Sequence, residues 1–230
     1  MKIKNSVVLV TGGNRGLGKA FVEEAIARGA AKVYAAARDP RAVTTPGAVP
    51  LALDVTDPDS VAEAAAAAGD VTLLVNNAGA FVGANYLTSP VADMRREFEV
   101  NFYGPLLVTR AFAPALVANG GHVLNVHSVL SWLALSGSYS ATKAALWSMT
   151  NSLRLDLAPR GVGVTGLHVG YVDTDMAAAV EAPKSSPAEV VRHALDGVES
   201  GAHEVLADDV TRTVKQGLAA DVSALYPQLA

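Results

Sequence analysis

A short apolar run near the start of the chain leads directly into a glycine-rich turn and then a helical pattern. Residues 7–10 read Val-Val-Leu-Val, and residues 11–18 read Thr-Gly-Gly-Asn-Arg-Gly-Leu-Gly. This order predicts a strand, a tight turn and a helix. Gly12, Gly16 and Gly18 allow a close backbone approach to a ligand, and amides at the helix N-terminus suit an anion such as pyrophosphate. The spacing is GxxxGxG rather than GxGxxG, and such a turn can also be a connection that only packs.

Further apolar segments recur along the chain, with helical patterns between most of them. We expect strands at residues 6–10, 32–36, 49–53, 71–75, 121–126, 162–168 and 203–206. The alternation predicts an α/β fold, a doubly wound parallel sheet of about seven strands with helices on both faces. The 230 residues, half of them hydrophobic, contain no proline-rich linker or internal repeat. We therefore expect a single domain spanning residues 1–230, with one loose segment at about 176–187.

Composition argues against several classes of protein. The formal net charge of −4 gives no basic surface for nucleic acid or for an anionic membrane. The absence of cysteine excludes disulfides and thiolate metal sites, and the five histidines lack metal-binding spacing, so we expect no metal. The N-terminal residues lead straight into the first strand, and no apolar run reaches membrane-spanning length. We expect a cytoplasmic protein.

Tyr139 and Lys143 are four residues apart in a helical pattern and therefore share one face. A free tyrosine has a pKa of about 10, and a nearby cation lowers that value. A phenol tuned in this way can transfer a proton near neutral pH. The same spacing also arises by chance in solvated helices.

Several motifs in a fixed order connect these two features. They are Asp54-Val55, Asn76-Asn77-Ala78-Gly79, Asn101-Phe102-Tyr103-Gly104, Ser128 and Gly170-Tyr171-Val172-Asp173-Thr174. With the glycine turn and the YxxxK pair, the chain resembles the short-chain dehydrogenase/reductases from residue 6 to about residue 175. The resemblance implies a Rossmann fold and hydride transfer between a nicotinamide and a carbonyl or alcohol.

The end of the second expected strand addresses the choice of nicotinamide cofactor. A carboxylate there would favour NAD, because it binds the ribose hydroxyls and repels the extra phosphate of NADP. The chain instead has uncharged Ala37 followed by Arg38, and Arg15 lies in the glycine turn. Two guanidinium groups suit a phosphate dianion, so we expect NADP (NADPH). Alternatively, Arg38 only pairs with Asp39 at the surface.

The resemblance also assigns the other cofactor contacts. Asp54 would accept from the adenine amino group, and Val172 and Thr174 would bind the nicotinamide carboxamide. The family's usual proline is replaced by Val169, which leaves the stiffness of that loop open. The full set of implied cofactor-binding residues is Gly12, Asn14, Arg15, Gly16, Leu17, Gly18, Arg38, Asp54, Val55, Asn76, Ala78, Gly79, Tyr139, Lys143, Val172 and Thr174.

Four residues match the catalytic positions of the family. Tyr139 would donate a proton to the substrate carbonyl oxygen, and Lys143 would lower the pKa of the phenol and bind the nicotinamide ribose. Ser128 would donate a hydrogen bond to the same oxygen. Asn101 would hold a water that connects Lys143 to solvent.

The interval from Ser128 to Tyr139 is 11 residues, about two shorter than is usual in the family. The shortened loop should reshape the substrate pocket, which we expect to take an apolar small-molecule ketone or alcohol. Candidate lining residues, each of which could instead pack in the core, are Phe81, Trp132, Leu133, Leu135, Tyr171 and the segment 176–187.

Other functions stay open at this stage. An imine reductase would share these motifs, and a non-catalytic NADP-binding sensor would keep the nucleotide site. Epimerases and dehydratases of the superfamily are usually longer after the sixth strand. Helices near 90–118 and 138–158 carry apolar residues on more than one face, which predicts a homodimer or homotetramer.

Overall fold

The computed structural model describes residues 1–229 and confirms the predicted sheet. Its strands are all parallel, in the order β3-β2-β1-β4-β5-β6-β7. All seven expected strands are present, with small differences at their ends: β1 (Val7–Thr11), β2 (Lys32–Ala37), β3 (Val49–Ala52), β4 (Leu73–Asn76), β5 (His122–Val126), β6 (Gly163–His168) and β7 (Glu204–Leu206).

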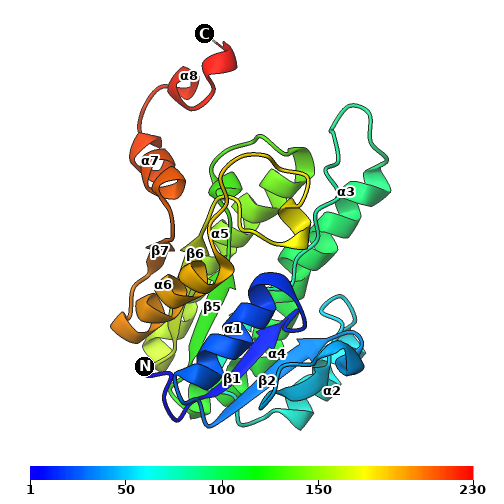
Figure 1. Cartoon of the computed structure of the whole chain (residues 1–230), viewed down its shortest axis with the longest axis vertical. Coiled ribbons are helices and arrows are strands. Elements are labelled where there is room, and N and C mark those ends of the chain that lie inside the picture. Colours follow the sequence, from blue (N-terminus) through cyan, green and yellow to red (C-terminus); the bar gives the residue numbers. More distant parts are fainter. Residues whose placement is uncertain (230) are drawn as a thin grey trace.

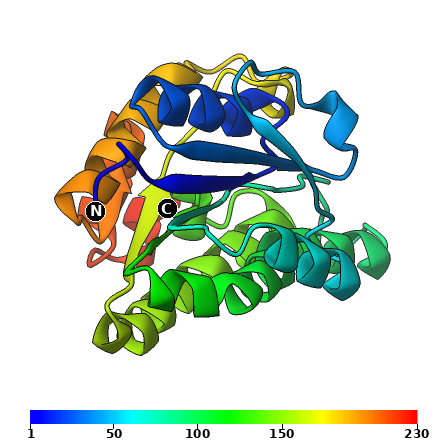
Figure 2. The same cartoon turned by 90° about the horizontal axis from the view of Figure 1, so that it is seen from below.

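Helices cover both faces of the sheet. One layer contains α1 and α6, and the opposite layer contains α2, α4 and α5, as Figure 2 shows. The helices are α1 (Gly16–Ala27), α2 (Pro58–Ala67), α3 (Val91–Phe98), α4 (Gly104–Ala118), α5 (Gly137–Leu157), α6 (Pro187–Ser200), α7 (Asp209–Gly217) and α8 (Val222–Leu225).

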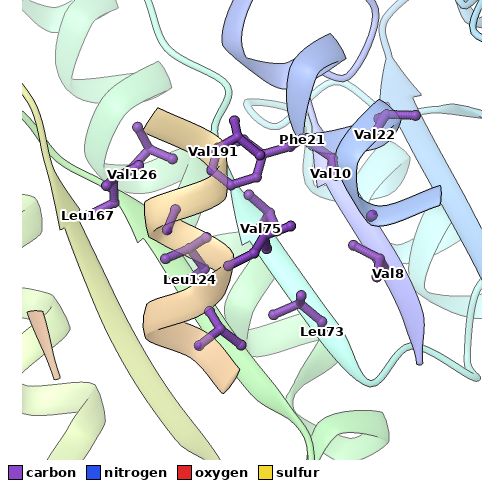
Figure 3. Packing of buried hydrophobic residues seen from close by; sticks show 14 of the residues in the cluster. Val8, Val10, Phe21, Val22, Leu73, Val75, Leu124, Val126, Leu167 and Val191 are labelled. Carbon is purple, nitrogen blue, oxygen red and sulfur yellow. The ribbon is translucent and has the colours of Figure 1, made fainter. Parts of the chain in front are cut away.

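The strands separate two hydrophobic cores. In β1, Val8 and Val10 pack under α1 and α6, whereas Leu9 points to the layer of α2 and α4. Figure 3 shows the first of these cores, where Phe21 of α1 and Val191 of α6 meet the strand side chains. Because both faces are covered, the strands read as nearly continuous apolar runs rather than as alternating patterns.

The strand order reverses between β1 and β4, which are direct neighbours. Helical connections leave these two strands toward opposite faces, so a crevice opens outside their carboxyl ends. Thr11 ends β1 and Asn76 ends β4 at this edge. The fold therefore places the glycine turn at the position where open α/β sheets bind ligands.

The C-terminal segment extends past β7 and away from the sheet, as α7 and α8 show in orange and red in Figure 1. The Tyr226 hydroxyl in this segment accepts a hydrogen bond from the Ala134 amide at 2.9 Å. None of the helices in the described part of the chain combines the length and hydropathy that a bilayer-spanning segment needs.

Candidate active site

The glycine turn joins the carboxyl end of β1 to the N-terminus of α1. Gly16 has a φ of +52°, in the left-handed region that favours glycine. A Cβ on Gly18 would collide with the carbonyl oxygen of Gly12, so only glycine fits there. Within residues 1–229 no side chain caps the N-terminus of α1, and its amides are available to an anion.

Two polar side chains that we did not predict as site residues fix this turn to the end of β4. Thr11 Oγ1 accepts hydrogen bonds from the amides of Asn77 and Ala78, each at 3.0 Å. The Asn77 side chain donates to the Thr11 carbonyl oxygen at 2.9 Å. Polar residues next to the glycines of both motifs were the available signal in the sequence. Together they hold the turn and the 76–79 segment as one wall of the crevice.

Asn76 is buried, and its side chain does not face the crevice. Its Nδ2 donates to Thr109 Oγ1 at 3.0 Å and to Asn125 Oδ1 at 2.8 Å. Asn125 in turn donates to Thr150 of α5. The side chain is thus a structural link between β4, β5 and two helices, and only the Asn76 main chain remains for the predicted nucleotide contact.

Arg38 is exposed at the carboxyl end of β2, directly after buried Ala37. Asp39 does not pair with it, because the Asp39 carboxylate accepts from Arg41 Nε at 2.9 Å and Nη2 at 3.0 Å. No ion pair to Arg38 is found among residues 1–229. The alternative in which Arg38 only pairs with Asp39 at the surface is therefore wrong, and the Arg38 guanidinium is available to a ligand.

Arg15, the second cation predicted at this site, lies in the turn itself. Its Nη1 is 3.5 Å from Asp175 Oδ2, and both side chains are more than 70% exposed. An ion pair this exposed is weak, so a phosphate could displace Asp175 from Arg15.

Asp54 follows β3 and has one carboxylate oxygen engaged by Thr56. The Thr56 amide donates to Asp54 Oδ1 at 3.0 Å and its hydroxyl at 2.7 Å. The Thr56 amide, with its hydroxyl and Arg38 as weaker contributors, lowers the pKa of Asp54, so the group is an anion and an acceptor at neutral pH. Val55 beside it is buried.

Two residues predicted in the glycine turn differ in burial. Leu17 is partly buried against the core under α1, so its side chain packs. Asn14 is half-buried.

The loop after β6 is fixed without the family's usual proline. The Gly170 amide donates to Asp208 Oδ2 at 2.7 Å, and the Val169 carbonyl accepts from the Val129 amide at 2.9 Å. Thr174 packs beside the turn, since its Cγ2 would lie 3.4 Å from a Cβ placed on Gly16. These bonds hold the loop in the absence of the proline.

The segment 176–187 is more regular than we expected. A single-turn 3₁₀ helix spans Asp175–Ala177, and α6 already begins at Pro187. Ser185 pairs back on the preceding loop, donating to the Tyr171 carbonyl at 2.8 Å and accepting from the Asp173 amide at 3.0 Å. Main-chain pairing that no local pattern indicates thus anchors the end of the segment, while residues 178–184 form turns and irregular backbone.

Tyr139 and Lys143 lie on the same face of α5, as predicted from their spacing. Lys143 Nζ is 5.6 Å from the centroid of the Tyr139 ring and donates to the Val126 carbonyl at 3.0 Å. Lys143 is only 5% exposed, and burial lowers the pKa of its ammonium to about 8. A buried cation therefore lies beside the phenol at the end of β5.

The predicted direction of the Tyr139 pKa shift is wrong. Burial raises the pKa of Tyr139, and the carboxylate of Glu97 raises it further. Desolvation disfavours the charged phenolate, and a nearby negative charge adds to this effect. Spacing alone indicated the cation on the same helix but neither the burial nor the carboxylate from another helix.

Ser128 follows β5 and caps a single-turn 3₁₀ helix (Val129–Ser131). Its Oγ accepts a hydrogen bond from the Leu130 amide at 3.1 Å, which leaves the hydroxyl proton free to donate. The side chain is 7% exposed. This geometry suits donation to a substrate oxygen.

Asn101 lies in a π-helical turn (Glu99–Tyr103) between α3 and α4, a distortion frequent at functional sites. Its Nδ2 donates to the Ala80 carbonyl at 2.8 Å and to Thr142 Oγ1 at 3.1 Å, and its Oδ1 accepts from the Ala80 amide at 2.8 Å. Both side-chain donors are thus occupied by protein groups. The side chain links the segment after β4 to the catalytic helix.

A cavity of about 540 Å³ lies between the segment after β4 and the loop before α5. Phe81 packs edge-on against the Tyr139 ring, with centroids 5.2 Å apart, and forms one wall. No charged side chain is among the lining residues, which are Phe81, Gly83, Ala84, Asn85, Tyr86, Leu87, Ala134, Leu135, Ser136 and Gly137. Phe81 and Leu135, two of the predicted substrate-pocket residues, line this cavity, whereas Leu133 and exposed Tyr171 do not.

Trp132 does not line this cavity. It is 9% exposed and stacks on His168, with ring centroids 4.1 Å apart. Trp147 packs edge-on against it, and Lys215 Nζ of α7 lies 4.8 Å from its ring centroid. Of the two alternatives left open for Trp132, the structure shows core packing, because Trp147 of α5, His168 of β6 and Lys215 of α7 surround its ring.

The arrangement as a whole combines a phenol, a buried ammonium and a free hydroxyl at the carboxyl edge of the sheet. The anion-binding turn lies at the same edge and has the close-approach geometry that a dinucleotide needs. No three histidine or carboxylate side chains within residues 1–229 cluster so as to hold a metal ion. Proton transfer coupled to a bound nucleotide is the chemistry that these groups support.

Comparison with known proteins gives matches over most of the chain. The family described as short chain dehydrogenase matches residues 6–185. A short-chain dehydrogenase of Burkholderia cenocepacia J2315, crystallised in complex with NADP, aligns with a TM-score of 0.95 and 42% identity, covering 100% of this chain and 99% of that one.

Two curated relatives are similar over shorter stretches. The sorbitol dehydrogenase of Cereibacter sphaeroides is 37% identical over 191 residues, which are 75% of this chain and 73% of the relative. The NADPH-dependent 1-acyldihydroxyacetone phosphate reductase of Schizosaccharomyces pombe is 39% identical over 139 residues, 57% of this chain. The match spans only 47% of the yeast protein.

Proposed function

Since the chain belongs to the short-chain dehydrogenase/reductase family, it is an NAD(P)-dependent oxidoreductase. We propose that it reduces apolar ketones with NADPH and oxidises the corresponding alcohols with NADP in the reverse direction. The observation that carries the chemistry is the Tyr139–Lys143 pair on α5, with the hydroxyl of Ser128 free to donate after β5. A cavity without charged lining residues adjoins Phe81, whose ring packs against Tyr139.

Preference for NADP over NAD is supported by the adenosine end of the crevice. Arg38 follows uncharged Ala37 and lacks an ion pair within the described chain, while Arg15 has only an exposed partner. A 2′-phosphate would receive hydrogen bonds from both guanidinium groups. The NADP complex of the Burkholderia protein and the NADPH dependence named for the yeast relative agree with this preference.

Tyr139 donates its phenolic proton to the substrate carbonyl oxygen during reduction, and accepts a proton from the alcohol during oxidation. The bound nicotinamide supplies or accepts the hydride. The raised pKa of Tyr139 keeps it protonated at neutral pH, the state that reduction requires. Ser128 donates its free hydroxyl hydrogen to the same substrate oxygen and stabilises the charge that develops there.

Lys143 compensates the phenolate that forms when Tyr139 gives up its proton. Its pKa of about 8 allows it to take up a proton or release one near neutral pH, so it can resupply Tyr139. Asn101 holds Thr142, which directly precedes Lys143, together with the main chain of Ala80. Since both Asn101 side-chain donors are occupied, the amide nitrogen is not available to hold a relay water.

The substrate is a neutral molecule with an apolar or aromatic body. Phe81, Leu87 and Leu135 line the cavity, and an ionic group bound there would find no counter-charge among the lining residues. Loss of NADPH absorbance with a panel of apolar ketones, diketones and cyclic imines tests this proposal. Turnover of ketones supports it, turnover of imines alone identifies an imine reductase, and tight NADPH binding without turnover identifies a nucleotide sensor.

We further propose a homodimer or homotetramer. Phe112, Leu116 and Leu146 of the predicted apolar faces are fully used in the internal core, but Leu155 on α5 is 77% exposed and Tyr103 before α4 is 46% exposed. A contact between copies of α4 and α5 would cover them. Light scattering across micromolar concentrations tests this, and a monomer throughout would refute it.

A further inference from the structure

Glu97 on α3 is a carboxylate with no exposed surface, and it lies beside the catalytic helix. Its Oε1 accepts hydrogen bonds from the amides of Val82 at 2.7 Å and Gly83 at 3.2 Å. Its Oε2 accepts from the hydroxyl of Ser138. Within the described residues no cation pairs with it. A buried anion is costly unless its oxygens are satisfied, and these three donors satisfy them.

These three bonds join two parts of the site that are distant in sequence. Val82 and Gly83 belong to the segment 80–87, which forms the cavity wall, and Ser138 precedes Tyr139 in the first turn of α5. The Ser138 amide also donates to the Ala84 carbonyl at 3.4 Å. The Glu97 carboxylate is therefore a clamp between the cavity wall and the catalytic helix.

Glu97 also acts on Tyr139 through its charge. Two charged side chains bear on Tyr139: Lys143 on the same helix, whose Nζ lies 5.6 Å from the ring centroid, and Glu97 from α3, whose carboxylate raises the pKa of the phenol. The Glu97 charge opposes phenolate formation, and its burial leaves it poorly screened by solvent. The two charges therefore act on the Tyr139 proton in opposite directions.

On the basis of the function proposed above, we infer that Glu97 is a positioning residue for the reaction. Its carboxylate holds the cavity wall and Tyr139 in one arrangement, and its charge retains the proton on Tyr139 until substrate is reduced. Glu97 does not touch the reacting atoms and acts through Ser138, Phe81 and the field at the phenol.

Two substitutions separate the clamp from the charge. In Glu97→Gln the amide oxygen still accepts from Val82 and Gly83, and the amide nitrogen can donate to the Ser138 oxygen, so the bonds survive without the charge. In Glu97→Ala both are lost. Glu99→Gln is the matched control, because Glu99 is exposed two residues further along the chain, at the start of the π-helical turn that follows α3.

Hydrogen exchange at residues 80–87 tests whether Glu97 holds this segment, and it does not depend on catalytic turnover. We expect protection of the Val82 and Gly83 amides to fall in Glu97→Ala and to persist in Glu97→Gln and Glu99→Gln. Equal exchange in Glu97→Ala and the wild type would overturn the clamp. This measurement stays valid even if the wild-type protein turns over no ketone, an outcome that would instead refute the proposed function.

The rate of alcohol oxidation tests the effect of the Glu97 charge on Tyr139. Alcohol oxidation requires deprotonated Tyr139, and because the pKa of Tyr139 is raised, only a small fraction of the enzyme is in that state near neutral pH. Removing the Glu97 charge lowers that pKa and enlarges this fraction, so at a fixed pH near neutrality Glu97→Gln should oxidise alcohol faster than the wild type with KM nearly unchanged. In Glu97→Ala, kcat/KM should instead fall about 10- to 100-fold, because the wall and phenol lose their alignment. An unchanged rate of alcohol oxidation in Glu97→Gln would refute the charge effect.

Discussion

The ammonium of Lys143 lies 5.6 Å from the ring centroid of Tyr139, while its hydrogen bond goes to the main-chain carbonyl of Val126. This bond fixes the side chain across the end of β5, with the charge beside the phenol and no direct contact to its oxygen among the described interactions. Tyr139 is thus a neutral acid next to a buried cation. The predictions on catalysis follow from this arrangement.

Tyr139→Phe should reduce kcat/KM about 10²- to 10⁴-fold, because the ring packing on Phe81 is kept and only the acid is lost. NADPH affinity, followed by fluorescence titration, should change little. Tyr103→Phe removes a hydroxyl from an exposed side chain and should leave both values at the wild-type level. Full turnover in Tyr139→Phe would exclude the phenol as the proton donor.

Arg38→Asp should weaken NADPH binding about 10- to 100-fold and NADH binding far less, since only NADPH carries the 2′-phosphate. Arg41→Asp makes the same charge change three residues later, at a side chain that already pairs with Asp39, and should have a smaller effect. Dissociation constants for both nucleotides would measure this. Equal losses for NADPH and NADH in Arg38→Asp would show that Arg38 does not contact the phosphate.

The sequence predicts the sheet well because most strands are short runs dominated by apolar residues and separated by turns. It also predicts the proximity of Tyr139 and Lys143, which depends only on helical spacing. What it misses depends on contacts between distant segments. Glu97 lies among Arg95, Arg96 and Glu99, which is typical of a solvated helix face, yet its donors come from residues 14, 15 and 41 positions away. No local pattern indicates that this carboxylate is buried.

The same reason explains the open alternatives at Trp132 and the error at Tyr139. Trp132 follows Ser128 in the loop before Tyr139, where aromatic residues commonly face substrate. Its neighbours, His168 and Lys215, come from β6 and α7. The direction of the Tyr139 pKa shift likewise depends on burial and on Glu97 from α3.

Trp132→Ala should lower the free energy of unfolding by about 3–5 kcal/mol, because it removes a buried aromatic ring from a stack. Leu135→Ala, at a 56% exposed side chain that lines the cavity, should leave stability near the wild-type value and alter the substrate profile. Urea unfolding and the ketone panel measure the two effects. Trp132→Phe, which keeps an aromatic ring, provides a milder variant if Trp132→Ala does not fold. A changed substrate profile at unchanged stability in Trp132→Phe would show that Trp132 lines the substrate pocket.

Stability should fall as the pH drops below about 6.5, the usual pKa of a histidine in an unfolded chain. Burial lowers the pKa of His122 to about 4 in the folded protein, where its Nε2 lies 2.8 Å from Thr165 Oγ1. Between these values the unfolded state binds a proton that the folded state does not, so His122 costs about 1.4 kcal/mol of stability per pH unit.

His122→Asn should therefore flatten the decline in unfolding free energy between pH 7 and pH 4, measured by urea unfolding at each pH. Any loss of packing in the variant is independent of pH and cancels in the slope. Some decline should remain, because burial also lowers the pKa values of His127 and His168. His193→Asn, at an exposed position of α6, should keep the wild-type slope. A parallel decline of the unfolding free energy in His122→Asn and in the wild type would contradict this prediction. It would mean that His122 has the same pKa in the folded and the unfolded protein.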